Sequence, residues 1–417
     1  MGSLSVAYSP WGAVAFFLAV ALVAATITDG AVFDALSTPV DVEDGRLRTV
    51  ISFALTGGAL AALVPAIDLP SQVYVATMLA VGFGDLGRRG VDAIRPGPVP
   101  RTAGFVFLGG AAAIFGQVLF AIAVGEPVLT PSMLFVGASG AFLGALLRSI
   151  LFARNDPLVL GFMTVLLWLL ASLSTGVGWE TVAIAIGISM LFGALSIAME
   201  TASIPGMLTG VFLSLLAVVL GGFGWFAVLM AFFGIGGLST KYQYEAKVKR
   251  GVAEPNEGAR GTGNVLGNSL ASLVALLLFA SHAHIPVPGA VLVYAFAGSV
   301  ATALADTLSS EIGGLYDRPR LLTTLETVEP GTDGAITWQG ELAGIAGATV
   351  IALLAVYALP IPQVGIAVVI GAGLVGMTVD SIAGATIEGT YIGNQAVNFL
   401  ATSSGGVAGG LLSVLVV

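Results

Sequence analysis

The chain has 417 residues, of which 57% are apolar and 9% are charged, and this composition is typical of a protein that lies in a membrane. The formal net charge of −9 argues against nucleic-acid binding, which requires a basic surface. The absence of cysteine excludes a disulfide framework and any metal site built from thiolates.

Apolar segments follow one another along the whole chain, and a helix that crosses a bilayer needs about 20 mostly apolar residues. We count fourteen such segments, which predict an all-α, polytopic membrane protein. The first lacks a basic leading region and a convincing cleavage site, so we interpret it as a retained helix rather than a signal peptide. The segments are 12–28, 48–67, 72–86, 102–124, 131–150, 158–175, 181–198, 205–221, 224–238, 264–282, 288–306, 340–359, 364–382 and 394–416.

The basic residues predict the orientation of the chain. All 15 Lys and Arg residues fall in, or at the edges of, the gaps after the first, third, fifth, ninth and eleventh segments. Because basic residues are retained on the cytoplasmic side, these gaps, including loops 239–263 and 313–338, are predicted to be cytoplasmic. Both termini are then extracytoplasmic, and the chain is predicted to be a multi-pass protein of the cell membrane.

Polar residues divide the chain into two parts. Residues 1–178 form an N-terminal transmembrane half whose polar residues follow no dense pattern, whereas residues 179–417 carry four polar clusters at the ends of predicted helices. Both parts are rich in Gly and Ala, which allow membrane helices to approach closely. We therefore interpret GGLL and GAGLVG as packing sequences.

The first cluster is the basic loop 241–268. Its candidate phosphate-binding cations are Lys247, Lys249, Arg250 and Arg260. Asn264 and Asn268 follow at i and i+4, so they share one face of the next helix near its N-terminus. A helix N-terminus beside basic side chains suits a phosphate group. The alternative interpretation is an ordinary positive-inside loop followed by an Asn cap, although Asn268 lies too deep to be a cap.

The second cluster is ATALADTLSSEIG, at the predicted cytoplasmic end of a span. Asp306, Ser309 and Ser310 are spaced i, i+3 and i+4, so a carboxylate and two hydroxyls line one face. Glu311 points elsewhere on a continuing helix and completes the candidate catalytic group. An ionisable group within a span is costly, and oxygen ligands suit Mg²⁺. The alternative is a carboxylate that reaches the membrane surface beside hydroxyl caps.

The third and fourth clusters repeat these patterns. Asp380 and Ser381, in GMTVDSIAGATIEG, again place a carboxylate and a hydroxyl at the predicted cytoplasmic end of a span. Asn394 and Asn398, in GNQAVNFLATSS, again stand at i and i+4 at the start of a helix. We predict that Asp306 and Asp380 face a common cavity and bind one metal ion, because two carboxylates at the same depth serve one ion only if adjacent.

These clusters carry a resemblance to a known family. GGFGWFAVLMAFFGIGGLSTK, GARGTGNVLGNS, ADTLSSEIG, RPRLLTT, VEPGTDGAITWQGELAGIAGA, VDSIAGATIEG and NQAVNFLAT occur in order over residues 180–417, and this stretch resembles the phytyl-phosphate kinase family of integral membrane proteins. In residues 1–178, RLRTVISFALTGG, VGFGDLGRRG and PRTAGFVFLGG resemble polyprenol kinases, without the histidine expected after the basic pair. That half is interpreted as a degenerate module or a membrane scaffold.

The resemblance implies a kinase that converts a prenyl monophosphate, such as phytyl or geranylgeranyl phosphate, into the diphosphate. The expected co-substrate is CTP or another nucleoside triphosphate with Mg²⁺, held by Asp306 and Asp380, and the expected partners include membrane lipid. The sequence contains no P-loop and no protein-kinase signature, so the nucleotide donor stays open. A lipid nucleotidyltransferase and a transporter or scaffold without catalysis are the alternatives.

Overall fold

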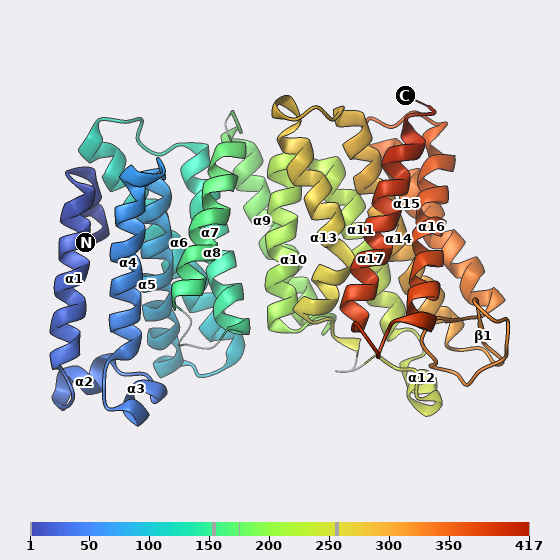
Figure 1. Ribbon diagram of the computed structural model, residues 1–417, viewed down its shortest axis with the longest axis horizontal. Coiled ribbons are helices and arrows are strands. Elements are labelled where there is room, and N and C mark those ends of the chain that lie inside the picture. Colours follow the sequence, from blue (N-terminus) through green and yellow to red (C-terminus); the bar gives the residue numbers. More distant parts are fainter. Residues whose placement is uncertain (1, 152–155, 175, 255–257, 417) are drawn as a thin grey trace. The chain divides into compact units, whose positions relative to one another are not determined.

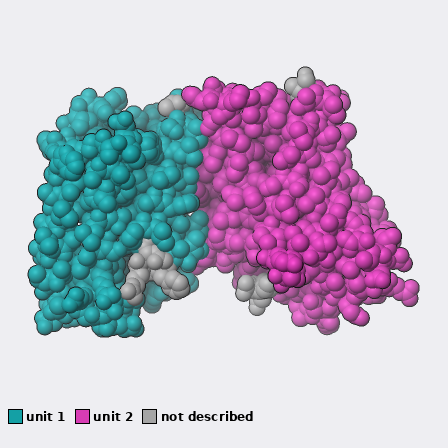
Figure 2. All heavy atoms as spheres, viewed as in Figure 1, with its two compact units in different colours: residues 1–186 teal, residues 187–417 magenta. Residues whose placement is uncertain are grey.

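The computed structural model describes residues 2–151, 156–174, 176–254 and 258–416. The chain divides into two compact units, residues 1–186 (unit 1) and 187–417 (unit 2), shown in Figures 1 and 2. Helices dominate both units, which confirms the prediction of an all-α membrane protein. The division falls inside the helix Trp179–Ala198, whereas the sequence predicts a boundary between residues 178 and 179, at the start of that helix.

Unit 1 is a bundle built around one buried helix, α7. Small residues in its GASGAFLGA stretch leave α7 buried along most of its length, and Thr130 caps its N-terminus by accepting a hydrogen bond from the Met133 amide. The elements of unit 1 are η1 (Gly2–Ala7), α1 (Pro10–Thr26), α2 (Gly30–Leu36), α3 (Pro39–Asp44), α4 (Arg48–Ala66), α5 (Ser71–Ile94), α6 (Pro98–Val124), α7 (Pro131–Ile150), α8 (Asp156–Leu173) and the first part of α9 (Trp179–Ala198).

Unit 2 is built around α14, which contacts α11, α13, α15, α16 and α17. Its only regular strands among the described residues are a short antiparallel pair between α14 and α15. After the end of α9, its elements are α10 (Ile204–Leu216), the π-helical turn η2 (Ala217–Gly221), α11 (Phe223–Lys241), α12 (Tyr244–Arg250), α13 (Thr262–Ala280), η4 (His282–His284), α14 (Gly289–Gly313), β1 (Arg320–Leu321), β2 (Ala335–Ile336), α15 (Trp338–Ala358), α16 (Gly365–Thr386) and α17 (Asn394–Ser413).

Among the described residues, fewer helices than the predicted fourteen have the length and composition of a membrane span. Each of the fourteen apolar segments falls on a long helix, but in the described part of the chain eleven helices qualify, or up to twelve if the bent pair α1 and α2 is one span. Two of the others, α5 and α17, carry too many polar groups: α5 contains charged residues from Asp85 onward, and α17 begins with Asn394 and Gln395. The count of fourteen spans is therefore not confirmed.

Close helix packing in unit 2 sets the position of the predicted acidic residues. Gly376 on α16 and Gly405 on α17 both lie against Thr302 of α14, where an added Cβ would overlap the threonine side chain. Thr302 precedes Asp306 by one helical turn, and Gly376 precedes Asp380 by one turn. The close approach of α14 and α16 therefore places the two aspartates side by side.

Candidate functional site

A polar cavity of about 680 Å³ lies at one end of unit 2. The C-terminal ends of α14 and α16, the N-terminal ends of α13 and α17, and residues 251–254, 258–261 and 313–337 form its walls. In Figure 1 this is the end that carries α12 and β1, and the chain's C-terminus lies at the opposite end of the unit. The predicted site residues that line the cavity are Arg260, Asn264, Asn268, Asp306, Ser309, Ser310, Glu311, Asp380, Ser381, Asn394 and Asn398.

The two aspartates meet in this cavity. The side chains of Asp306 and Asp380 both line it, and their carboxyl groups are close enough to interact directly. Oδ1 of Asp380 is buried and has no hydrogen-bond partner among the described residues. Two carboxyl groups held together need either a proton or a cation between them, because their negative charges repel.

Hydroxyl groups surround the carboxyl pair. Ser310 Oγ donates a hydrogen bond to the Thr307 carbonyl oxygen at 3.1 Å, and Ser381 Oγ donates to the Met377 carbonyl oxygen at 3.2 Å. Ser309 also lines the cavity. The Ser310 and Ser381 hydroxyls donate their protons to carbonyl oxygens of their own helices. Their oxygen lone pairs can therefore accept a hydrogen bond or bind a cation.

These groups fit a magnesium ion that is shared with a substrate. No group of three or more His, Asp or Glu side chains among the described residues is arranged to hold a metal ion by itself. Mg²⁺, however, is commonly bound by one or two carboxylates together with substrate phosphates and water. Asp306 and Asp380, with an orphaned carboxylate oxygen, supply such a pair.

Arg260 is the cation of the cavity. Its side chain is only 8% exposed, and Nε and Nη1 have no hydrogen-bond partner within the described ranges. The guanidinium lies over the Phe232 ring, 5.2 Å from its centroid. Burial lowers the pKa of Arg260, and the nearby Glu311, Glu254 and Asp306 carboxylates oppose this effect. Because an arginine in a protein stays protonated, Arg260 is a buried positive charge ready for an anion.

Two helices open into the cavity without side-chain caps. Gly261 precedes α13 and Gly393 precedes α17, and neither helix has a side-chain cap hydrogen bond. By contrast, Ser203 caps α10 and Thr337 caps α15. The first amides of α13 and α17 are therefore left for a ligand, and they carry the positive end of each helix dipole.

The asparagine pairs follow these open ends but do not cap them. Nδ2 of Asn268 donates to the Asn264 carbonyl oxygen at 3.0 Å, and Nδ2 of Asn398 donates to Oδ1 of Asn394 at 3.3 Å. Oδ1 of Asn264 is buried without a partner among the residues the structure describes. The packing of α13 against α17 brings both pairs into one cavity.

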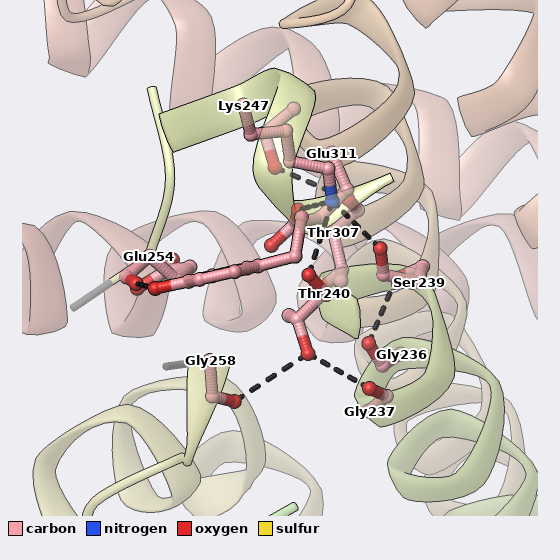
Figure 3. A network of polar contacts seen from close by, with 11 residues as sticks. Gly236, Gly237, Ser239, Thr240, Lys247, Glu254, Gly258, Thr307 and Glu311 are labelled. Carbon is pink, nitrogen blue, oxygen red and sulfur yellow. Dashed lines mark hydrogen bonds and ion pairs between the residues drawn. The ribbon is translucent and has the colours of Figure 1, made fainter. Parts of the chain in front are cut away.

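Three of the four cations that were expected to bind phosphate lie outside the cavity. Lys247, Lys249 and Arg250 do not line it. Lys247 is 1% exposed, and its ammonium group binds Glu311 at 2.5 Å and the carbonyl oxygens of Ser239 and Thr240 (Figure 3). A lysine whose donors are all used by the protein holds α12 in place and has none left for phosphate. The same ion pair occupies Glu311, which was expected in the catalytic group.

The other two cations are also accounted for without a ligand. Arg250 donates hydrogen bonds to the carbonyl oxygens of Gly314 and Tyr316 and to Asp317, so it ties α12 to the loop after α14. Lys249 is exposed on α12. The two loops that were predicted to lie on one membrane face are thus joined directly.

Several cavity residues were missed in the sequence analysis. Glu254, Asp333, Glu388 and Gln395 all line the cavity. Partial burial, and then the neighbouring Asp333 carboxylate, raise the pKa of Glu388, while a hydrogen bond from Asn394 opposes this shift. For Asp333, Glu388 and Gln395 the available signal was their position within VEPGTDGAITWQGELAGIAGA, VDSIAGATIEG and NQAVNFLAT, because those stretches carry the family resemblance, whereas Glu254 lies outside all of the quoted stretches.

Comparison with protein families places unit 2 in a membrane family. The family described as Integral membrane protein DUF92 matches residues 187–406. This range begins with the first residue of unit 2, and it contains every residue named above as lining the cavity. No solved structure matches the chain.

Individual relatives cover less than half of this chain. "Uncharacterized membrane protein MJ0933" of Methanocaldococcus jannaschii is 38% identical over 193 residues, which are 46% of this chain and 77% of that protein. "Uncharacterized membrane protein sll0875" of Synechocystis is 32% identical over 188 residues, 44% of this chain and 72% of that protein. "Protein VTE6, chloroplastic" of Arabidopsis thaliana is 31% identical over 187 residues, 44% of this chain and 56% of that protein.

Proposed function

Because the chain belongs to the DUF92 family of integral membrane proteins, we propose that unit 2 is a kinase that converts a prenyl monophosphate into the diphosphate. The phosphoryl donor is CTP or another nucleoside triphosphate, with Mg²⁺. The resemblance to phytyl-phosphate kinases supports this proposal, and so does the similarity to VTE6. The basic loops that flank the cavity support its placement on the cytoplasmic face, where a soluble nucleotide and a membrane lipid meet.

One observation carries the proposal: a pair of neighbouring carboxyl groups shares a cavity with two uncapped helix N-termini and a buried guanidinium whose Nε and Nη1 have no hydrogen-bond partner among the described residues. Phosphoryl transfer requires mainly the positioning of two phosphate groups and the neutralisation of their charge. Arg260 and the open amides of α13 and α17 suit phosphate oxygens, and the aspartates suit a divalent cation.

The reaction needs no strong base at the acceptor. An oxygen of the prenyl monophosphate attacks the γ-phosphorus of the nucleotide, the bond from that phosphorus to the bridging oxygen breaks, and the nucleoside diphosphate leaves. A phosphate monoester is largely ionised at neutral pH because its second pKa is about 6. This agrees with the position of the chain's two histidines in η4, between the ends of α13 and α14 that point away from the cavity.

Each group has a defined task in this proposal. Asp306 and Asp380 would hold Mg²⁺, which would supply neutralisation of the phosphate charge. Ser309, Ser310 and Ser381 supply further oxygens beside that pair. Arg260 holds the acceptor phosphate, and the asparagine pairs orient phosphate oxygens at the two helix ends.

The proposal is tested with purified full-length protein, geranylgeranyl monophosphate, Mg²⁺ and each nucleoside triphosphate labelled at the γ-phosphate. The expected product is a labelled prenyl diphosphate together with unlabelled nucleoside diphosphate, resolved by mass. A lipid product that retains the nucleotidyl group would instead identify a nucleotidyltransferase. If no triphosphate yields either product, the catalytic proposal fails and a transport or scaffold role becomes the leading hypothesis.

A further inference from the structure

A second cavity, apolar and about 260 Å³ in volume, lies in unit 2 among α9, α10 and α11. We call it the apolar groove. Its lining is mainly aliphatic, aromatic and thioether side chains, including Phe192, Met207, Val211, Met230 and Phe233. Arg260 lines the apolar groove and the polar cavity alike, so the two spaces meet at this residue.

The backbone of Arg260 fixes it at this junction. Its amide donates to the Thr201 carbonyl oxygen at 3.0 Å, and its own carbonyl oxygen accepts from the Ser203 amide at 3.1 Å, so it is tied to the segment that enters α10. Its guanidinium lies beside Gly236 of α11, where an added Cβ would be 2.9 Å from Nη2. The cation is thus held between the two helices that flank the apolar groove.

The apolar groove runs from Arg260 into the membrane part of unit 2. Gly206 packs on the Arg260 carbonyl, and Gly210 and Ser214 line the groove one and two turns further along α10. Eight residues of helix span about 12 Å, which is less than half of the ~30 Å hydrocarbon core. Met199 and Leu238, also part of the lining, are 52% and 56% exposed, so the groove has a side open to lipid.

We propose that the apolar groove binds the phosphate-proximal part of the prenyl chain, with the phosphate held by Arg260 and the distal chain in the bilayer. This rests on the proposed function. An anionic head on a long apolar chain requires a desolvated cation at the mouth of an apolar channel, and the structure has both at one point. Burial of methylene and methyl groups in the groove supplies affinity that the phosphate alone would lack.

Two glycines allow the groove to be filled without disturbing the fold. Gly210 of α10 and Gly234 of α11 line it, and an added Cβ at either position meets open space. Leucine at either position would therefore occupy the groove while remaining a good helix former. Gly187 of α9 also has open space at its Cβ but lies outside the groove, so Gly187→Leu is a matched control.

The experiment measures equilibrium binding of radiolabelled geranylgeranyl monophosphate and of geranylgeraniol to the full chain in detergent, without nucleotide. Gly210→Leu and Gly234→Leu should weaken both ligands at least about tenfold, which corresponds to losing the burial of about two methylene groups. Gly187→Leu should bind both as the wild type does. Arg260→Gln should weaken the phosphate but leave geranylgeraniol binding unchanged.

The outcomes separate the groove from the reaction. Wild-type affinity for both ligands in Gly210→Leu and Gly234→Leu would overturn the groove proposal even if diphosphate is formed. If the wild type forms no diphosphate but the binding pattern holds, the groove stands and the kinase assignment fails. Equal competition by oleyl monophosphate, whose chain is unbranched, would overturn the assignment of the groove to a prenyl chain.

Discussion

Both units contain a buried arginine, but they neutralise its charge in different ways. In unit 1, Arg148 of α7 is 7% exposed and binds Asp85 at 2.8 Å and Asp156 at 2.5 Å. In unit 2, Arg260 is as deeply buried and has no hydrogen-bond partner for Nε or Nη1 among the described residues. A buried charge is costly unless it is paired, so the two arrangements call for different explanations.

The difference separates a structural ion pair from a candidate binding site. Arg148 pairs with Asp85 and Asp156, Asp85 also pairs with Arg88 at 3.4 Å, and these ion pairs join α5, α7 and α8. Asp85 lies in VGFGDLGRRG, the stretch that resembles polyprenol kinases, and its carboxylate is held in these ion pairs. Arg260, by contrast, fits a ligand that brings its own negative charge.

The largest expected effect comes from the carboxyl pair. Asp306→Asn and Asp380→Asn keep the side-chain shape but remove the charge that holds Mg²⁺, so turnover should fall on the order of 100-fold or more. Neutralising an aspartate near a membrane span should ease its burial, so insertion and expression should persist. Turnover with geranylgeranyl monophosphate and monodispersity in detergent are the two measurements.

Asp85→Asn is the matched control from unit 1. It breaks an ion pair with Arg148 and should lower the melting temperature, while turnover per folded molecule stays at the wild-type level. If Asp306→Asn and Asp380→Asn both convert prenyl phosphate at the wild-type rate when folded, the carboxyl pair of unit 2 is not catalytic, and unit 2 does not differ from unit 1 in this respect.

Local patterns in the sequence predicted much of this arrangement. The apolar segments predicted the long helices because a membrane helix is defined by the continuous hydropathy of its own residues. The spacing of Asn264 with Asn268 and of Asn394 with Asn398 predicted shared helix faces, and all four residues line the cavity. The adjacency of Asp306 and Asp380 was inferred from equal depth, and the packing of α14 on α16 provides it.

Contacts between distant segments could not be predicted in this way. Nothing local to Lys247 indicates that its ammonium group binds Glu311, 64 residues later, rather than a phosphate. Basic residues in a loop follow the positive-inside rule whichever way each side chain turns, so the sequence could not separate Arg260 from the other three cations. The apolar groove also could not be predicted from the sequence, because α9, α10, α11 and Arg260 each contribute only part of its wall.

Substitution of either buried arginine should have a smaller effect than loss of the carboxyl pair. Arg260 should affect substrate binding, whereas Arg148 should affect stability. Arg260→Gln removes a charged phosphate contact, so KM for the prenyl phosphate should rise about tenfold to 100-fold with little loss of thermal stability. Arg148→Gln leaves the buried Asp156 carboxylate without its cation and should cost about 3–5 kcal/mol of stability. KM and melting temperature measured on both variants test the comparison directly. A stability loss in Arg260→Gln as large as in Arg148→Gln would mean that Arg260 also serves the fold.

The smallest effect is expected at Lys249, which the sequence analysis assigned to phosphate binding. Its side chain is exposed on α12 and outside the polar cavity, so Lys249→Ala should change KM by no more than about twofold. Arg95→Ala in unit 1 is a matched control, because Arg95 is exposed and follows the end of α5. Any effect of these two variants should diminish as ionic strength rises, whereas the effect of Arg260→Gln should persist, since ions screen exposed charges far more than buried ones. A tenfold rise in KM for Lys249→Ala alone would extend the phosphate site beyond the cavity to α12, and burial would then no longer distinguish the cations that bind the substrate from those that do not.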